Sequence, residues 1–164
     1  MISVSLILPD IRSTHNVGAI FRSAEIFGVK HIYICGYTPY PLINNDTRLP
    51  HISNKLDKQI SKTALGTEKL VSFSYCKTAE LAIAQSRQDG CQIIALEQTH
   101  SSTMLNKAKF NDKVAIILGR EVEGIDENII NLADFCVEIP QKGTKESLNV
   151  SNACAIMLYH ISTI

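Results

Sequence analysis

The chain has 164 residues, of which 45% are hydrophobic and 20% are charged. That length suits one compact domain, expected over residues 1–164, and the composition excludes general disorder. The 16 basic and 16 acidic residues cancel, which excludes a polycationic surface. Contact with nucleic acid therefore has to come from a local basic patch or from a surface shared between subunits.

The first half of the chain alternates between apolar strands and an amphipathic helix. Residues 3–8 form an apolar run that ends at a proline, which is typical of a buried strand. A helix is predicted over residues 16–27, because apolar side chains recur on one face and Gly28 follows as a stop signal. After a second strand at residues 31–35, residues 36–59 are predicted to form a long polar connection, and connections of that length are usually functional or disordered.

The second half continues the alternation, which predicts an α/β fold with a parallel sheet covered on both faces. In such sheets ligands bind beyond the carboxyl ends of the strands, so the loops after the strands are the places to look for a site. We predict strands over residues 71–75, 91–96, 114–118 and 135–139, and helices over residues 78–88, 127–133 and 149–162.

Five cysteines, an odd number, occur without a C-x-x-C pair: Cys35, Cys76, Cys91, Cys136 and Cys154. Most of them lie in apolar segments, so we expect reduced core thiols in a cytoplasmic protein. No Cys/His cluster has the spacing of metal ligands, which predicts no metal site. The sequence has neither a signal-peptide pattern at residues 1–8 nor an apolar run of membrane-spanning length, so no membrane association is expected.

A first polar segment, Asn16-x-Gly18-x-x-x-Arg22, opens the first predicted helix. A glycine in the first helical turn costs about 1 kcal/mol relative to alanine, which suggests the close approach of another backbone or of a ligand. Arg22, on the polar side of the helix, could hold a phosphate through two parallel hydrogen bonds. The alternative is that Gly18 serves helix packing and that Arg22 is a solvated side chain.

A second segment, Gly119-x-Glu121-x-x-Gly124, follows the most hydrophobic predicted strand. Gly119 would let a ligand lie against the strand end, and Glu121 could orient a cation or accept a hydrogen bond from a hydroxyl group. An ordinary exposed turn is the alternative.

A third segment runs from Pro140, which cannot continue a sheet, to the last predicted helix. Ser147 and Asn149 are both favourable helix caps, and the free backbone N–H groups at a helix N-terminus can hold a ligand. Simple capping is the alternative, for which either residue alone would suffice.

Together these segments resemble the three motifs of the SpoU-type (TrmH-like) RNA ribose 2′-O-methyltransferases of the SPOUT class. The resemblance runs from Leu6 to about Tyr159 in the family's order and spacing, with Ser147-Leu148-Asn149-Val150-Ser151 as the third motif. It implies an enzyme that uses S-adenosylmethionine to methylate a ribose 2′-hydroxyl in tRNA or rRNA. It also implies a homodimer and a parallel sheet with a C-terminal deep trefoil knot, a rare exception to ordinary chain topology.

The resemblance also assigns roles to individual residues. It implies Arg22 as the catalytic residue, the base that activates the 2′-hydroxyl with help from a nearby phosphate. The alternative, because a guanidinium stays protonated in proteins, is that Arg22 orients the hydroxyl and the phosphate and stabilises the developing alkoxide. The supporting polar set that it implies is Asn16, Glu121, Ser147 and Asn149. The residues that it implies for S-adenosylmethionine are Gly119, Ile139 and Leu148, largely through backbone groups, and Leu96 as a lining side chain.

Residues 48–69 carry five positive and two negative charges, a local excess of three. We expect the basic residues Arg48, Lys55, Lys58 and Lys62 to contact RNA from a mobile loop, with a solvated surface as the alternative. The last predicted helix also has more apolar residues than one core contact needs, among them Ile156 and Tyr159, which predicts that it forms the homodimer interface.

Two other function classes stay open on the sequence. The chain could be a non-catalytic RNA-binding or assembly module that kept the fold, although such a module has no need of the complete polar set. It could also be a different nucleotide-binding α/β protein, although neither G-x-x-x-x-G-K-[ST] nor G-x-G-x-x-G occurs in it.

Overall fold

The structure, a computed structural model, describes residues 1–120, 123–145 and 147–164. The described residues form a seven-stranded sheet with the strand order β3-β2-β1-β6-β4-β7-β5, and every strand pairing in it is parallel. The predicted parallel α/β fold is thus confirmed. The strands are β1 Ser3–Pro9, β2 His31–Cys35, β3 Phe73–Cys76, β4 Gln92–Leu96, β5 Thr103–Met104, β6 Lys113–Leu118 and β7 Phe135–Glu138.

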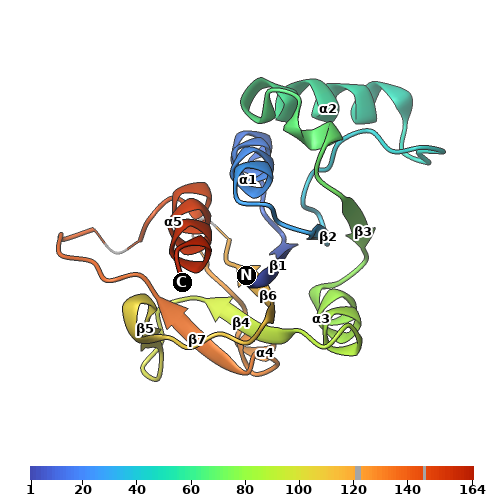
Figure 1. The fold of residues 1–164 in the computed structure, drawn as a ribbon. Coiled ribbons are helices and arrows are strands. Elements are labelled where there is room, and N and C mark those ends of the chain that lie inside the picture. Colours follow the sequence, from blue (N-terminus) through green and yellow to red (C-terminus); the bar gives the residue numbers. More distant parts are fainter. Residues whose placement is uncertain (121–122, 146) are drawn as a thin grey trace.

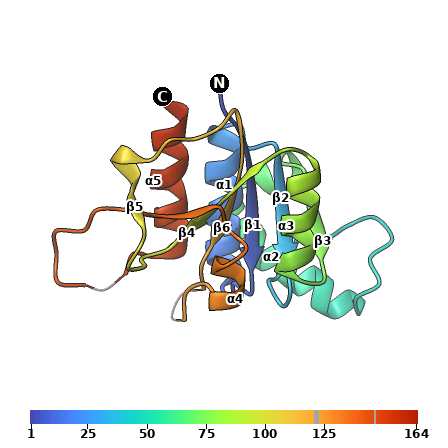
Figure 2. The ribbon, with the colours of Figure 1, turned by 90° about the horizontal axis from the view of Figure 1, so that it is seen from below.

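Helices lie on both faces of the sheet (Figure 1). Two long helices, α1 Thr14–Ile26 and α5 Val150–Ser162, lie side by side on one face, and α3 Ala79–Gln88 and α4 Glu127–Ile130 cover the other (Figure 2). The helix α2 Pro50–Ala64 packs against α1, farther from the sheet. Two short 3-10 helices, η1 Thr67–Lys69 and η2 Leu105–Lys107, complete the described helical elements.

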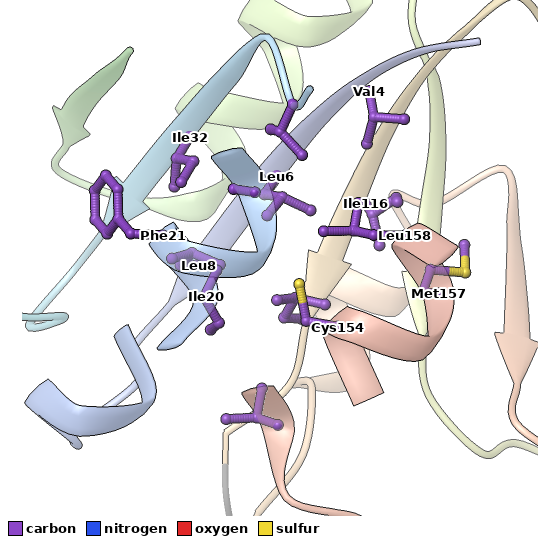
Figure 3. Close-up of a cluster of buried hydrophobic side chains, with 14 of the residues drawn as sticks. Val4, Leu6, Leu8, Ile20, Phe21, Ile32, Ile116, Cys154, Met157 and Leu158 are labelled. Carbon is purple, nitrogen blue, oxygen red and sulfur yellow. The ribbon is translucent and has the colours of Figure 1, made fainter. Parts of the chain in front are cut away.

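Because the sheet is covered on both faces, successive residues of its central strands belong to two different cores. On the α1/α5 face, Leu6 and Leu8 of β1 pack with Ile20, Phe21 and Cys154, all of them fully buried (Figure 3). On the other face, Ile7 and Ile117 pack with the α3 side chains Ala82 and Ile83. This double burial explains the near-continuous apolar runs of the central strands.

The long polar connection predicted over residues 36–59 is wrong in its second part, where α2 begins at Pro50. A proline is favourable in the first helical turn, because the N–H that it lacks would have no partner there. Few side chains of α2 are buried, notably Ile60 and Ala64, which are fully inaccessible. The apolar stripe that holds α2 to α1 is therefore too narrow to stand out among lysines and polar residues.

Gly18 serves the packing of α1 against α2. A Cβ atom at this position would lie 2.1 Å from Thr63 Oγ1 and 2.3 Å from the carbonyl oxygen of Ile60. Thr63 Oγ1 also donates a hydrogen bond to the carbonyl oxygen of His15 over 2.9 Å. Of the two explanations for Gly18, helix packing is the one that the structure supports.

Other strand and helix boundaries differ from the prediction by one to three residues, and one strand was missed. The helix α1 begins two residues early, because the hydroxyl of Ser13 accepts a hydrogen bond from Asn16 N over 3.2 Å and caps it. The helix α4 is a single turn that ends at Ile130 rather than at residue 133. The two-residue strand β5 is too short to show periodicity and was not predicted.

Candidate active site

The residues predicted to hold a cofactor gather at the carboxyl edge of the sheet. Leu96 ends β4, Gly119 follows β6, Ile139 follows β7, and Leu148 precedes α5. All four line one cavity of about 280 Å³, and Ser147 lines it as well. The loops after β4, β6 and β7 meet there, as expected for parallel strands, whereas no residue of the segment from Asn16 to Arg22 lines the cavity.

The lining of this cavity combines apolar side chains with acidic ones. Leu96, Ile139 and Leu148 are joined by further aliphatic residues, Leu118, Val137, Val150 and Ala153. The charged residues of the lining are three acidic ones, Glu97, Glu123 and Glu138, and one basic one, Arg120. Such a lining suits a ligand with a flat apolar part and a positive charge.

Glu97 holds the glycine-bracketed segment against β4. Its Oε2 accepts a hydrogen bond from Ile125 N over 2.9 Å, and its Oε1 accepts one from Gln98 N over 3.0 Å. A Cβ atom at Gly124 would lie 2.5 Å from Glu97 Oε2, and one at Gly119 would lie 3.1 Å from the same oxygen. A side chain at Gly124 would therefore displace Glu97, and the positive φ of 69° at Gly124 favours glycine as well, whereas Gly119 makes a close but less restrictive contact.

Glu97 was not predicted from the sequence, although a carboxylate directly after an apolar strand was a usable signal. Glu138 was missed in the same way: it ends β7, lines the cavity, and its Oε2 accepts a hydrogen bond from Ser102 Oγ over 2.6 Å. Glu121, predicted as a supporting residue, lies outside the described residues.

Arg120 connects the segment between Gly119 and Gly124 to Asp126. Its guanidinium donates hydrogen bonds to the carboxylate of Asp126 and to the carbonyl oxygen of Gly124, the latter over 3.2 Å. Partial burial opposes the charge, but the neighbouring Asp126 raises the pKa of Arg120, which keeps it cationic. Glu123 lies 4.0 Å from Arg120 and 3.5 Å from Arg12, so charged groups continue outward from the cavity.

Asn149 connects the first and third polar segments. It caps α5, because its Oδ1 accepts a hydrogen bond from Ser151 N over 2.9 Å. Its Nδ2 donates a hydrogen bond to Asn16 Oδ1 over 3.1 Å. The capping explanation for Asn149 is therefore correct, but the cap uses only one end of the amide.

Arg22 lies away from the cavity of its own chain. It is an exposed residue of α1 and follows Asn16 by six positions, about 9 Å along a helix axis. Within the described part of the chain, neither Arg22 nor Asn16 nor Asn149 is among the residues that line the cavity. One chain thus brings together the predicted cofactor residues and Ser147, and it joins Asn16 to Asn149, but it leaves Arg22 apart.

The predicted RNA contacts separate into two kinds. Lys55, Lys58 and Lys62 are exposed on α2, where their spacing puts them on one helix face rather than in the mobile loop that was expected. Arg48 is instead held by its own chain, 2.5 Å from Asp46 Oδ2 and hydrogen-bonded to the carbonyl oxygens of Tyr40 and Pro41 over 2.9 and 3.0 Å. The hydrogen bonds from Arg48 hold the pKa of Asp46 well below its usual range.

All five cysteines are free thiols, and burial raises the pKa of Cys154 to about 12. In residues 1–120, 123–145 and 147–164, no group of three or more His, Cys, Asp or Glu side chains could hold a metal ion. No helix in those ranges has the length and apolar character needed to cross a membrane.

Comparison with known proteins identifies a matching family and relatives with a similar fold. Residues 3–159 match the SpoU rRNA Methylase family. The tRNA (guanosine(18)-2′-O)-methyltransferase of Borreliella burgdorferi is 27% identical over 158 residues, which cover 96% of this chain and 65% of that protein. The 23S rRNA (guanosine-2′-O-)-methyltransferase RlmB of Coxiella burnetii is 29% identical over 161 residues, which cover 95% of this chain and 56% of that protein. This chain thus spans only part of the length of these curated relatives.

A solved structure has the same fold. The crystal structure of an AdoMet-bound rRNA methyltransferase from Sinorhizobium meliloti has a TM-score of 0.78 at 23% identity, and the match covers 96% of this chain and 55% of that one. The family match extends over all the described strands and over all three polar segments, two of which contribute residues to the cavity. The chain therefore belongs to the SpoU rRNA Methylase family.

Proposed function

We propose that this protein uses S-adenosylmethionine to methylate a ribose 2′-hydroxyl of tRNA or rRNA. The observation that carries the proposal is the convergence of Leu96, Gly119, Ile139, Leu148 and Ser147 on one cavity at the carboxyl edge of the sheet. Family membership supports it, as do the names of the two curated relatives, both of which describe 2′-O-methylation of guanosine in RNA.

The cavity fits the methyl donor chemically. Its aliphatic side chains suit an adenine ring, and the carboxylates of Glu97, Glu123 and Glu138 favour a positively charged ligand such as a sulfonium. When bound, S-adenosylmethionine supplies the methyl group, so the protein has to supply alignment and charge stabilisation. We assign Gly119, Ile139 and Leu148 to holding the donor, largely through backbone groups, and Leu96 to lining the pocket.

A homodimer forms part of the proposal, because Arg22 does not line the cavity of its own chain. The side chains of Ile26, Ile156 and Tyr159 are 64%, 40% and 62% exposed on the adjacent helices α1 and α5. Tyr159 also packs edge-on against Phe27, with 6.4 Å between the ring centroids. Covering this apolar surface with a second copy would stabilise the pair and bring Arg22 of one subunit to the cavity of the other.

In this dimer each polar residue has a separate role in the reaction. Arg22 orients the 2′-hydroxyl and a neighbouring phosphate and stabilises the alkoxide as it forms. Ser147, at the cavity, contacts the hydroxyl, while the Asn149–Asn16 hydrogen bond fixes α5 relative to α1. Lys55, Lys58 and Lys62 bind RNA phosphates from the exposed face of α2. The proposal also includes three further features: a deep trefoil knot, a single domain over residues 1–164, and a cytoplasmic location.

The proposal is tested with purified protein, radiolabelled S-adenosylmethionine, and bulk tRNA and rRNA. We expect label in RNA that survives alkaline hydrolysis as a dinucleotide, since a 2′-O-methyl group blocks cleavage of the adjacent phosphodiester. Calorimetry with S-adenosylmethionine alone tests the cavity independently. Donor binding without RNA labelling would instead favour a non-catalytic RNA-binding module, and absence of donor binding would contradict the proposal altogether.

A further inference from the structure

A second cavity, of about 430 Å³, lies beyond the carboxyl ends of β2 and β3. Three tyrosines, Tyr37, Tyr40 and Tyr75, line it together with Arg12 and Arg48, and among the residues that the structure describes its lining includes no carboxylate. Because the sheet is parallel, this cavity and the proposed donor cavity lie at the same edge. Neither the predicted site residues nor the proposed chemistry explains why three aromatic rings gather there.

Two of the three rings stack on each other within the chain. Tyr40 stacks on Tyr75, with 5.0 Å between ring centroids and 30° between ring planes, and the guanidinium carbon of Arg48 lies 3.5 Å from the Tyr40 centroid. Asp46 and two backbone carbonyl groups hold Arg48 in that place. The stack is therefore preorganised, so a ligand that joins it loses little by ordering it.

Tyr37 and Tyr75 offer exposed surface to a ligand. Tyr37 is 53% exposed and Tyr75 is 45% exposed, which is unusual for such large side chains in one small area. The guanidinium of Arg12 lies 5.8 Å from the ring centroid of Tyr37. Exposed aromatic faces beside arginines are the combination on which unpaired nucleic-acid bases stack.

Arg12 links the aromatic platform, which consists of Tyr37, Tyr40 and Tyr75, to the donor cavity. Arg12 lines the aromatic cavity and forms an ion pair of 3.5 Å with Glu123, which lines the donor cavity. On the other side, Leu56 of α2 lines the aromatic cavity, and its neighbours Lys55 and Lys58 belong to the basic face of that helix. The platform thus lies between the donor cavity and a basic helix.

We propose that Tyr37 and Tyr75 stack on an unpaired base that flanks the methylated nucleotide of the RNA, which rests on the proposed function. RNA is the occupant favoured by charge, because the adjoining helix α2 exposes Lys55, Lys58 and Lys62, whereas the two arginines of the lining are paired with Asp46 and Glu123. Stacking tolerates any base, so the platform contributes affinity and positions the strand without requiring a defined sequence.

The platform is tested directly by measuring how tightly the protein binds a fluorescent single-stranded oligoribonucleotide. Fluorescence anisotropy gives the affinity, and no methyl donor is present. We expect Tyr37→Ala and Tyr75→Ala each to weaken binding about fivefold or more, the low end of what loss of a stacking partner costs. Tyr→Phe at either position should bind within about twofold of wild type, and Tyr→Leu should behave as Tyr→Ala, because leucine keeps apolar area but no aromatic face. Leu70→Ala, which truncates a 71% exposed apolar residue before β3, should not change binding.

Photocrosslinking keeps the test independent of how well the variants fold. An oligoribonucleotide that carries 5-iodouridine should crosslink to Tyr37 or Tyr75 of the wild-type protein, as mapped by mass spectrometry. Crosslinks confined to other regions, or a folded Tyr37→Ala/Tyr75→Ala double variant with wild-type RNA affinity, would overturn the platform. So would preferential binding of a proline-rich peptide to these tyrosines. Neither readout depends on methyl transfer, so failure of the platform and failure of the enzymatic proposal remain distinguishable.

Discussion

Asn149 Nδ2 donates a hydrogen bond to Asn16 Oδ1 over 3.1 Å, although the two residues are 133 positions apart in the chain. The other end of the Asn149 amide caps α5 through hydrogen bonds from Ser151 N and Asn152 N. One side chain therefore starts the last helix and joins it to the beginning of the first. Because the two tasks use different atoms, substitution can separate them.

Substitution of Asn149 should distinguish the cap from the contact with Asn16. Asn149→Ala should lower the free energy of unfolding by about 1 kcal/mol and strongly reduce methyl transfer, since both tasks are lost. Asn149→Asp keeps the capping oxygen but removes the donor to Asn16, so we expect near wild-type stability with low activity. Urea denaturation and methyl incorporation measure the two effects, and full activity of Asn149→Asp would show that the contact is dispensable.

Gly18→Ala should destabilise the fold by about 1–3 kcal/mol, because the added methyl group would clash with Ile60 O and Thr63 Oγ1 between α1 and α2. Gly143→Ala is the matched control, since a Cβ atom there would meet nothing within 4 Å, and its effect should be within about 0.5 kcal/mol. Urea denaturation of both variants measures the difference. Equal stability of the two would refute the close-packing role of Gly18.

The exposed face of α2 should give RNA binding its salt dependence. Replacing Lys55, Lys58 and Lys62 by glutamine should reduce the slope of log affinity against log salt by about two to three, since each phosphate contact contributes roughly 0.7–0.9. Lys30→Gln, at the opposite edge of the sheet before β2, should leave the slope unchanged. An unaltered slope in the triple variant would mean that RNA binds elsewhere.

Cys154 should resist alkylation in the folded protein. Burial raises its pKa to about 12, so at pH 8 almost no thiolate is present, whereas in the unfolded chain the thiol titrates near 8.5. The stability that the neutral buried thiol contributes is complete below that unfolded value and is lost as the pH rises toward 12. Mass spectrometry after iodoacetamide treatment should find the half-buried Cys76 and Cys91 modified well before Cys154.

Periodicity was sufficient to predict the sheet, because strands buried on both faces must be apolar along their whole length, as β6 is. It failed for α2, whose buried side is narrow, and for β5, which has only two residues. Boundary errors arose where a side chain outside the apolar pattern fixes the end, as Ser13 does for α1.

The donor cavity could be anticipated because parallel strands necessarily end at one edge, so residues after β4, β6 and β7 meet there. The role of Glu97 could not be predicted from the sequence, because it depends on contact with Gly124, which is 27 positions later in the chain. Charge counting also cannot reveal that Arg48 is neutralised by Asp46, or that Tyr37 and Tyr75 line one cavity. Such relationships exist only in three dimensions.

Complementation between two inactive variants tests most directly whether Arg22 acts at the cavity of the other subunit. Arg22→Ala removes the guanidinium but keeps the cavity. Gly119→Val should block donor binding, because its branched side chain would crowd the cavity that Gly119 lines, where a Cβ atom already lies 3.1 Å from Glu97 Oε2 and 3.2 Å from Gly124. Each variant alone should be inactive.

Co-expression of the two variants with different tags, and purification through both, isolates the mixed dimer. One of its two sites then combines an intact cavity with an intact Arg22, so we expect about half of the wild-type rate of methyl transfer. A folded mixed dimer with no more activity than its parents would contradict the assignment of Arg22 to the partner's cavity.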